Sequence, residues 1–388
     1  MPKVNIEELR KQCKERGLKS SSLKKEELIT LLSSATSIDA KFVLQPMITY
    51  IGNKRKLVPW IIDIIKEIGT NLKILDGFAG SGVVSRALMQ YCSELHSNDM
   101  EYYSYILLRC FLETPTLEQK ERIDKHFAAN IVPEYGFISK LYSPENTVEP
   151  LQGERCFYTR ENALIIDAWM KYIDGVEPDI KHYLLGPLLI KASIHVNTAG
   201  VFRGFYKKDG IGHFGGAGEN ALERILAPIR IEKPIWSTSS CKTVCHHSDI
   251  NELILTVDHF DVIYLDPPYN EHPYGSNYFM LNVIASGQEP VECSKVSGIP
   301  KIWNKSVFNG RNSAFDSMLE LLTVCLQKAT YVLISYNNEG IITDWPSIFQ
   351  TLQCTVKKFE KEYDTYHGSR NLEGRNKKVV EIMYLIKN

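Results

Sequence analysis

The apolar run Phe260-Asp261-Val262-Ile263-Tyr264-Leu265 ends abruptly at Asp266-Pro267-Pro268-Tyr269. The run predicts a buried strand because it is rich in β-branched and aromatic residues. Each proline fixes φ and lacks an N–H, so the pair cannot continue a sheet ladder. A carboxylate, a proline carbonyl and an aromatic ring are left together at the strand end, where they could bind a flat amine such as adenine N6. The same four residues are also compatible with an ordinary turn after a strand.

A second strand end carries a glycine-rich loop. Residues 72–75 predict a short strand, residues 76–82 read Asp76-Gly77-Phe78-Ala79-Gly80-Ser81-Gly82, and a helix over 83–91 leads to a strand ending at Asn98-Asp99. Glycines let the backbone approach a ligand, and the missing third glycine of G-x-G-x-x-G favours a cofactor without a pyrophosphate. Asp99 lies 17 residues beyond Gly82, near the spacing at which an acid reaches ribose hydroxyls. Together with Asp266, these strand ends predict one crevice at the carboxyl edge of a sheet.

Strands and helices alternate over much of the chain, which predicts an α/β fold. Helices are expected over 56–69 and 314–327, and strands over 243–247, 331–335 and 379–387, the last as an edge or hairpin strand. Residues 101–240 are irregular, mainly helical and acidic at first, then basic over 191–208. We therefore expect one domain from 41–103 and 241–388 with residues 104–240 inserted.

The segment from Val4 to Ser34 is typical of a small module of its own. Apolar residues recur at helical spacing on both sides of a Gly17-Leu18 stop and a serine link. This pattern over 1–35 resembles a SAP domain, a small DNA-binding fold, through Leu9, Gly17-Leu18, Lys25, Leu28 and Leu32. A glycine that the SAP pattern often has near Ser22 is absent. An ordinary helical hairpin with a charged face fits the same residues.

Charge and cysteine content limit the classes of function. The net charge of -1 excludes a uniformly basic coat for nucleic acid, so a DNA surface must come from local patches. Nine irregularly spaced cysteines and the lack of a signal-like start predict an intracellular, cytoplasmic protein with reduced thiols. The longest apolar run, residues 183–190, is too short for a membrane span and is interpreted as core. The cluster Cys241-Lys242-Thr243-Val244-Cys245-His246-His247 predicts a strand rather than a metal site, because its side chains alternate between faces.

Two further motifs complete an ordered set. Tyr50-Ile51-Gly52-Asn53-Lys54-Arg55-Lys56-Leu57 precedes the glycine loop, and Ser248-Asp249-Ile250 lies between that loop and Asp266. From Gln45 to the C-terminus this order resembles the N6-adenine-specific DNA methyltransferases of the alpha arrangement, to which Dam-type enzymes belong. The resemblance implies a Rossmann-like class I S-adenosylmethionine-dependent sheet with a largely helical target-recognition insertion. It implies double-stranded DNA as partner and allows for a separate cognate restriction endonuclease; the oligomeric state stays open.

The resemblance also assigns roles to individual residues. Catalysis falls to Asp266, Pro267, Pro268 and Tyr269, and no metal is required. The S-adenosylmethionine contacts that it implies are Tyr50, Gly52, Lys54, Asp76, Gly80, Gly82, Asp99, Asp249 and Asp266. Lys54 to Lys56 as a solvated charge run, and Asp249 as a turn residue, are the alternatives for those positions.

Methylation of adenine N6 sets the remaining requirements. Its lone pair is delocalised into the ring, so acceptors at Asp266 and the Pro267 carbonyl would favour a more pyramidal nitrogen. The base would leave the duplex and stack on Tyr269, with Tyr278 or Phe279 as further candidates, beneath a closing loop at 272–277. The predicted DNA contacts are Lys191, Asn197, Arg203, Lys207, Lys208, Asn277, Tyr278 and Arg370, although the basic stretch could equally be a solvated surface.

Three other functions use the same residues. The Asp-Pro-Pro-Tyr corner also suits methylation of guanine N2 in RNA or cytosine N4 in DNA. A third alternative is a DNA-binding scaffold without catalysis. The motif at 50–57, the insertion and the SAP-like module favour duplex DNA, and the intact Asp266 and glycine loop favour an enzyme.

Overall fold

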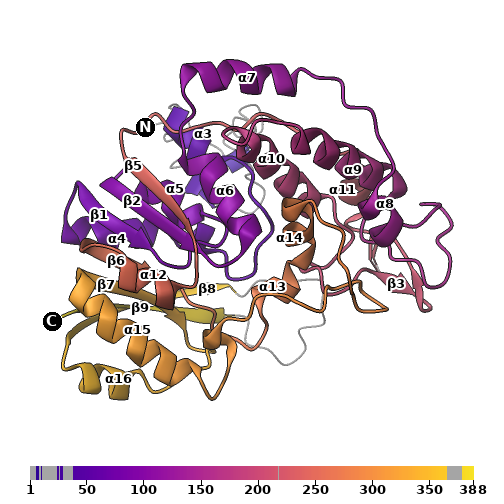
Figure 1. Ribbon diagram of the computed structural model, residues 1–388. Coiled ribbons are helices and arrows are strands. Elements are labelled where there is room, and N and C mark those ends of the chain that lie inside the picture. The colour runs from indigo at the N-terminus through magenta and orange to yellow at the C-terminus, as the bar shows by residue number, and fades with distance from the viewer. Residues whose placement is uncertain are drawn as a thin grey trace.

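A seven-stranded sheet and a bundle of helices form two adjoining lobes (Figure 1). The computed structural model describes residues 38–216, 218–364 and 378–388, with residues 6, 7, 10, 24, 25, 27 and 28 nearer the N-terminus. Most of the SAP-like segment therefore lies outside the described residues, as does Arg370. Within the described residues, no helix is long and apolar enough to cross a membrane.

The sheet is parallel except for one strand. In spatial order it contains β5 (Lys242–His247), β2 (Cys92–Asp99), β1 (Leu72–Asp76), β6 (Phe260–Leu265), β7 (Ala329–Asn337), β9 (Lys378–Lys387) and β8 (Thr355–Asp364). Strand β9 runs antiparallel to both of its neighbours. The chain moves outward in opposite directions from β1 and β6, so the order reverses between these two strands. In open α/β sheets, ligands bind at the carboxyl ends of the strands at such a point.

Helices cover both faces of the sheet. On one face lie α4 (Val58–Ile68), α5 (Val83–Leu88) and α6 (Tyr102–Leu112), with α3 (Ile38–Leu44) packed on α5. On the other lie α12 (Ile250–Thr256), α15 (Ala314–Lys328) and α16 (Trp345–Leu352). Consecutive residues of β1 illustrate the division, since Ile74 packs into the first layer and Leu75 into the second. Successive side chains of a strand point to opposite faces, and helices cover both faces here. The strands therefore read as continuous apolar runs.

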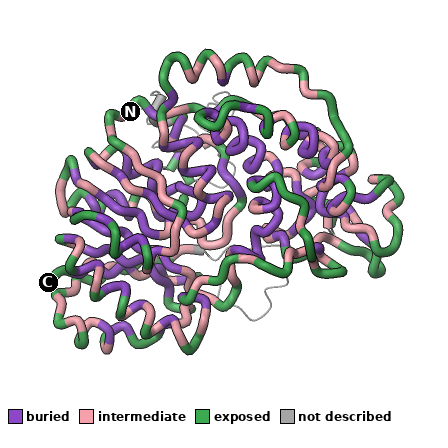
Figure 2. Tube along the Cα trace, viewed as in Figure 1, coloured by how far each residue is buried: buried purple, intermediate pink, exposed green. Residues whose placement is uncertain are grey.

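The second lobe is mainly helical. It contains α7 (Leu117–Phe127), α8 (Phe137–Tyr142), α9 (Arg160–Asp174), α10 (Lys181–Ile194) and α11 (Leu222–Leu226), with the small hairpin β3 (Lys207–Lys208) and β4 (Ile211–Gly212). After β6, α13 (Tyr274–Asn277) leads into α14 (Phe279–Ser286), which packs on α6 and α10. The run 183–190 is buried within α10, as expected for core. Buried residues continue from the sheet into this lobe (Figure 2).

The predicted α/β fold is confirmed, with differences at its edges. The expected boundary at residue 104 falls inside α6, which packs on β2 and β5 as well as on α10, and the domain division stays a prediction. Of the two alternatives for residues 379–387, the hairpin strand is confirmed, because β9 pairs antiparallel with the preceding β8, whereas the edge position is wrong, because β9 also pairs with β7. The sequence did not predict β8, whose exposed and partly exposed charged residues hide its alternation.

Candidate active site

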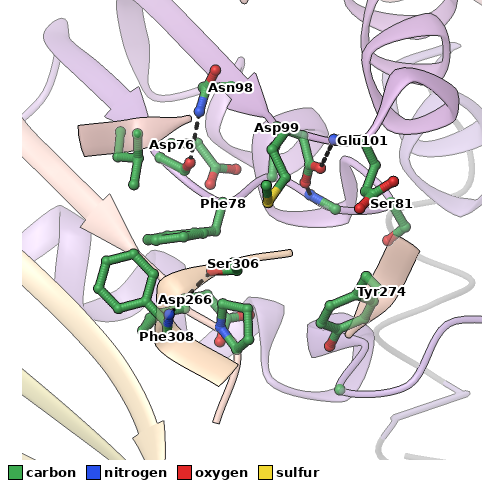
Figure 3. Close-up of a pocket in the computed structure, with 18 of the residues that line it drawn as sticks. Asp76, Phe78, Ser81, Asn98, Asp99, Glu101, Asp266, Tyr274, Ser306 and Phe308 are labelled. Carbon is green, nitrogen blue, oxygen red and sulfur yellow. Dashed lines mark hydrogen bonds between the residues drawn. The ribbon is translucent and has the colours of Figure 1, made fainter. Parts of the chain in front are cut away.

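The carboxyl ends of β1, β2 and β6 open into one cleft (Figure 3). The cleft encloses about 900 Å³, including its opening to solvent. Its lining contains Asp76, Asp99 and Asp266, one acid from each of the three strand ends. The structure thus brings together the three groups that the sequence placed in one crevice.

The glycine loop after β1 approaches the cleft closely. Gly80 adopts a left-handed φ of 53°, and a Cβ built there would lie 2.9 Å from Cε1 of Tyr50. Its N–H donates a hydrogen bond of 2.7 Å to Oδ2 of Asp99. Side chains other than glycine are disfavoured by both the backbone angle and the contact. The loop is therefore fixed against β2, with its backbone facing the cleft.

Asp76 is a buried carboxylate at the end of β1. Its Oδ2 accepts a hydrogen bond of 2.6 Å from Ser85, while Oδ1 finds no hydrogen-bond partner within the described part of the chain. Burial raises the pKa of Asp76 to about 7, and the nearby Asp266 and Asp99 contribute to the increase. A buried acceptor without a partner, facing a cavity, is suited to a positively charged or N–H-bearing ligand.

The end of β2 supplies a second pair of acids. Asp99 accepts the Glu101 N–H through Oδ1, and burial raises its pKa despite this and the Gly80 bond. Glu101 also lines the cleft, where burial raises its pKa to about 7 and Asn282 and Asn304 donate to it. Glu101 was missed from the sequence, although its position two residues after a strand-end acid was the available signal.

A buried cation joins the Asp266 corner. Lys54, in the short helix η1 (Lys54–Lys56), places Nζ 2.9 Å from Oδ1 of Asp266 and 2.9 Å from Oε1 of Glu381 on β9. Burial opposes the charge on Lys54, but the two carboxylates more than offset this and hold its pKa well above the ordinary value. Burial raises the pKa of Asp266 to about 6, although Lys54 opposes the increase. Lys54 is therefore a buried ion-pair partner of Asp266 rather than part of a solvated charge run.

Aromatic rings line the cleft beside Asp266. Tyr269 is partly exposed, and Lys54 Nζ lies 5.6 Å from its ring centroid. Tyr50 stacks on Tyr274 and Tyr278, with ring centroids 4.9 Å apart in each pair. Tyr278 itself is fully buried, and its hydroxyl accepts the N–H of Ile51. Tyr50, Tyr269 and Tyr274 are all partly exposed and line the cleft, and Tyr269 is the one of the three that directly follows the Asp266-Pro267-Pro268 corner.

Apolar residues form the other wall of the cleft. Phe78 follows β1, and its ring meets that of Phe308 in η2 (Val307–Asn309) edge-on, with centroids 5.4 Å apart (Figure 3). Ile250 and Asp249 line the same side. Asp249 caps α12 by accepting the Asn251 N–H, so it combines the turn role with a place in the cleft. No sequence motif marked Phe308, because its loop lies 42 residues beyond Asp266 and reaches the cleft only by folding back.

This arrangement of cleft, acids and aromatic corner agrees with the comparisons. Residues 50–347 match the D12 class N6 adenine-specific DNA methyltransferases. The chain belongs to this family. It is accordingly an enzyme, a DNA adenine methyltransferase, and the family implies a methyl donor.

Curated relatives of this methyltransferase carry similar descriptions. Type II methyltransferase M.NlaIII from Neisseria lactamica is 29% identical over 306 residues, covering 76% of this chain and 84% of that protein. Type II methyltransferase M.CviAII from Paramecium bursaria Chlorella virus 1 is 30% identical over 311 residues, covering 76% and 85%. Modification methylase StsI from Streptococcus sanguinis is 26% identical over 364 residues, covering 87% of this chain and 51% of that protein.

Three of the residues predicted to contact DNA are instead buried in the methyltransferase. Asn197 is fully buried; its amide donates to the carbonyls of Cys156 and His213, and its oxygen accepts from Gly215. Asn277 and Tyr278 are 4% and 0% exposed. These three predictions are corrected, because the side chains are used within the fold. Phe279, 1% exposed, is likewise no candidate for stacking on a base.

The basic residues of the insertion differ in their availability. Lys191 is partly buried and forms an ion pair with Glu232 at 2.8 Å. Arg203, Lys207 and Lys208 are exposed, the two lysines on β3. Nη1 of Arg203 lies 3.2 Å from Nδ1 of His272, just after the catalytic corner. The insertion and the active-site loop are thus adjacent, and these three cations stay predicted DNA contacts.

The cysteine and histidine cluster forms β5, as expected. Cys241 lies immediately before this strand, with its Sγ 3.5 Å from that of Cys92, and His246 contacts His96 on the neighbouring β2. Among the described residues, no group of three or more His, Cys, Asp or Glu side chains is placed to hold a metal ion.

Proposed function

We propose that this methyltransferase is site-specific and transfers the methyl group of S-adenosylmethionine to N6 of an adenine flipped out of double-stranded DNA. The observation that carries the proposal is the Asp266-Pro267 acceptor pair at the end of β6, on the cleft that Asp76 and Asp99 also line. The Type II names of M.NlaIII and M.CviAII support a place in restriction and modification, with a separate endonuclease as partner.

The cleft residues suit S-adenosylmethionine, which carries a ribose, an adenine and a cationic amino acid. Asp99 and Glu101 offer carboxylates for ribose hydroxyls, and Phe78 and Ile250 offer apolar surface for a purine. Asp76, whose Oδ1 lacks a partner among the described residues, suits the cationic end. Gly52 and Gly80 leave backbone space beside these groups, whereas Gly82, also predicted to contact the donor, is not part of the cleft lining. When bound, the donor supplies an electrophilic methyl group.

Asp266 and Pro267 would act on the accepting amine. Asp266 holds its Oδ1 against Lys54 and keeps 17% of its side chain exposed at the cleft. The Pro267 carbonyl, in a residue with no N–H of its own, is a second acceptor. Two acceptors on the amine hydrogens would favour the pyramidal nitrogen that attacks a methyl group, and would stabilise the positive charge that develops there. The Tyr269 ring would fix the plane of the base.

DNA would reach this corner from the side of the insertion. Three exposed cations lie on this side. Arg203 is close to the active-site loop, and Lys207 and Lys208 are on the neighbouring hairpin. Phosphate contacts by such cations position a duplex without reading its sequence. Unstacking of one base would then present its amine to Asp266, because the cleft is too small for a duplex.

The test is methyl transfer from labelled S-adenosylmethionine to unmethylated duplex DNA, followed by hydrolysis to nucleosides. We expect label in N6-methyl-2′-deoxyadenosine and a loss of at least about 100-fold in Asp266→Ala, with DNA affinity nearly unchanged. Label only in RNA or in methylcytosine would refute the proposal. Mapping the methylated adenines in DNA from expressing cells would give the recognition sequence.

A further inference from the structure

Asp266 belongs to a buried group of three charges. Lys54 contributes the only cation of this group, and its Nζ lies 2.9 Å from both Asp266 and Glu381. The Lys54 side chain is 4% exposed and that of Glu381 is 0% exposed, whereas Asp266 keeps 17%. One end of the group is therefore sealed inside the sheet, and the other opens on the cleft.

Glu381 is held from two further strands. Its Oε1 accepts a hydrogen bond of 2.6 Å from Ser335 on β7, and its Oε2 accepts one of 3.1 Å from Tyr363 on β8. On β9 it shares the buried face with Val379 and Met383. A buried acid on an otherwise apolar strand face is costly unless paired, so these contacts fix its position firmly.

We propose that Glu381 is a positioning residue for methyl transfer. It anchors Lys54, and Lys54 in turn holds Oδ1 of Asp266, so that the second carboxylate oxygen is presented to the amine of the base. This inference rests on the proposed function, in which Asp266 accepts an N–H of adenine. It assigns a role to a strand that lies outside the cleft and that is 115 residues from Asp266 in sequence.

A single Lys54–Asp266 pair would be electrically neutral and would make Asp266 a weak acceptor. The second carboxylate gives the group one net negative charge, so that Asp266 retains its attraction for a nitrogen that becomes positive. The same contacts explain why the short helix η1 is fixed at this point, since Lys54 has a partner on each side. Positioning errors of about 1 Å at reacting atoms reduce rates roughly 100-fold.

The group should control how activity depends on pH. Burial raises the pKa of Asp266 most, Lys54 lowers it, and the negative charge of Glu381 raises it further. Removing the charge of Glu381 should therefore lower the pKa of Asp266. The other titratable groups that face Asp266 are Asp76 on β1 and the phenols of Tyr264, Tyr269 and Tyr274. Burial raises the pKa of each phenol, so they stay neutral below pH 8.

The decisive variant is Glu381→Gln, which keeps the shape and removes the charge. With S-adenosylmethionine saturating, kcat and KM for DNA are measured from pH 5 to pH 9. We expect kcat to fall about 10- to 100-fold, with KM for DNA changed less than about threefold. The acid limb of the pH–rate profile should move to lower pH. Glu362→Gln, an exposed acid on β8, is the matched control and should behave as wild type.

A second readout does not need activity. Loss of the Glu381 charge should lower the pKa of the Lys54 amine and speed its acylation by a small reagent, measured by mass spectrometry with exposed Lys125 as internal reference. If Glu381→Gln does not fold, Ser335→Ala and Tyr363→Phe each remove one bond to Glu381 and should change both readouts in the same direction.

The outcomes separate the two proposals. If the wild-type protein transfers no methyl group to DNA, the proposed function is overturned. The rate of Lys54 acylation then still tests whether Glu381 holds Lys54. An unchanged acid limb together with unchanged Lys54 reactivity overturns the positioning role, even if kcat falls, because a merely structural acid would give that result. Wild-type kcat in Glu381→Gln overturns it as well.

Discussion

At the scale of single residues, the cleft concentrates acids that hold protons near neutral pH. Burial is the main reason that the pKa of Asp76 and of Glu101 rises to about 7 and that of Asp266 to about 6. Such groups weaken the fold when they ionise, and they gain stability when a cationic ligand arrives. The site is therefore built at some cost to the stability of the free protein.

Asp76→Asn should reveal this cost. The pKa of Asp76 rises from 3.8 to about 7 on folding, so the stability due to its protonated form is full below pH 4 and lost as pH rises through 7. Asparagine cannot ionise, and the variant should gain about 2–4 kcal/mol in unfolding free energy at pH 8, with a smaller gain at pH 5. Urea unfolding without donor measures this; an equal difference at both pH values would contradict it. The Asp76→Asn variant should also bind S-adenosylmethionine more weakly than the wild-type protein does.

At the scale of elements, the β1–α5 loop depends on one tight glycine. Gly80→Ala introduces strain at a φ of 53° and a Cβ 2.9 Å from Tyr50, so it should cost about 1–2 kcal/mol and weaken donor binding in calorimetry. Gly287→Ala is the control, because its φ of 67° brings similar strain while its Cβ meets nothing within 4 Å. Similar donor affinity in both variants would show that the loop does not approach the ligand.

The β3–β4 hairpin is the element that we expect to contact the duplex. Lys207→Gln and Lys208→Gln should each weaken DNA binding across all sequences and reduce the salt slope by about one, since each removes one phosphate contact. Lys125→Gln on α7, which lies away from β3, is the charge-matched control (Figure 1). Fluorescence anisotropy from 50 to 300 mM salt measures the slopes; equal slopes in the three variants would argue against a hairpin contact.

At the scale of the whole molecule, two lobes share one core while the cleft opens at the sheet edge. Within the described residues, α3 packs against the sheet lobe through Phe42. The guanidinium carbon of the buried Arg86 lies 5.7 Å from the centroid of the Phe42 ring. Deleting residues 1–35 should therefore leave folding and methyl transfer intact. It should lower DNA affinity and its salt dependence if the SAP-like segment binds DNA. Methylation and anisotropy assays check both; an unchanged salt slope would count against a DNA-binding role for the segment.

Local sequence determined the strand ends and the order of the motifs. The apolar run before Asp266, the glycines after Asp76 and the acid at Asp99 each follow from backbone chemistry within a few residues, and they placed three strand ends in one crevice. The same local patterns predicted DNA contacts for polar side chains such as Asn197 that the structure buries. A sequence does not show that an amide will be buried and fully hydrogen-bonded within the fold.

Only the tertiary structure decided what surrounds those strand ends. Antiparallel β9 enters the sheet beside β7 and brings Glu381 to Lys54, and the loop before α15 brings Phe308 to Phe78. These contacts join residues far apart in the chain, and no local preference encodes them, because they arise from sheet pairing and packing. The sequence by itself determined the chemical groups of the Asp266 corner, whereas long-range pairing decided which charges hold it in place.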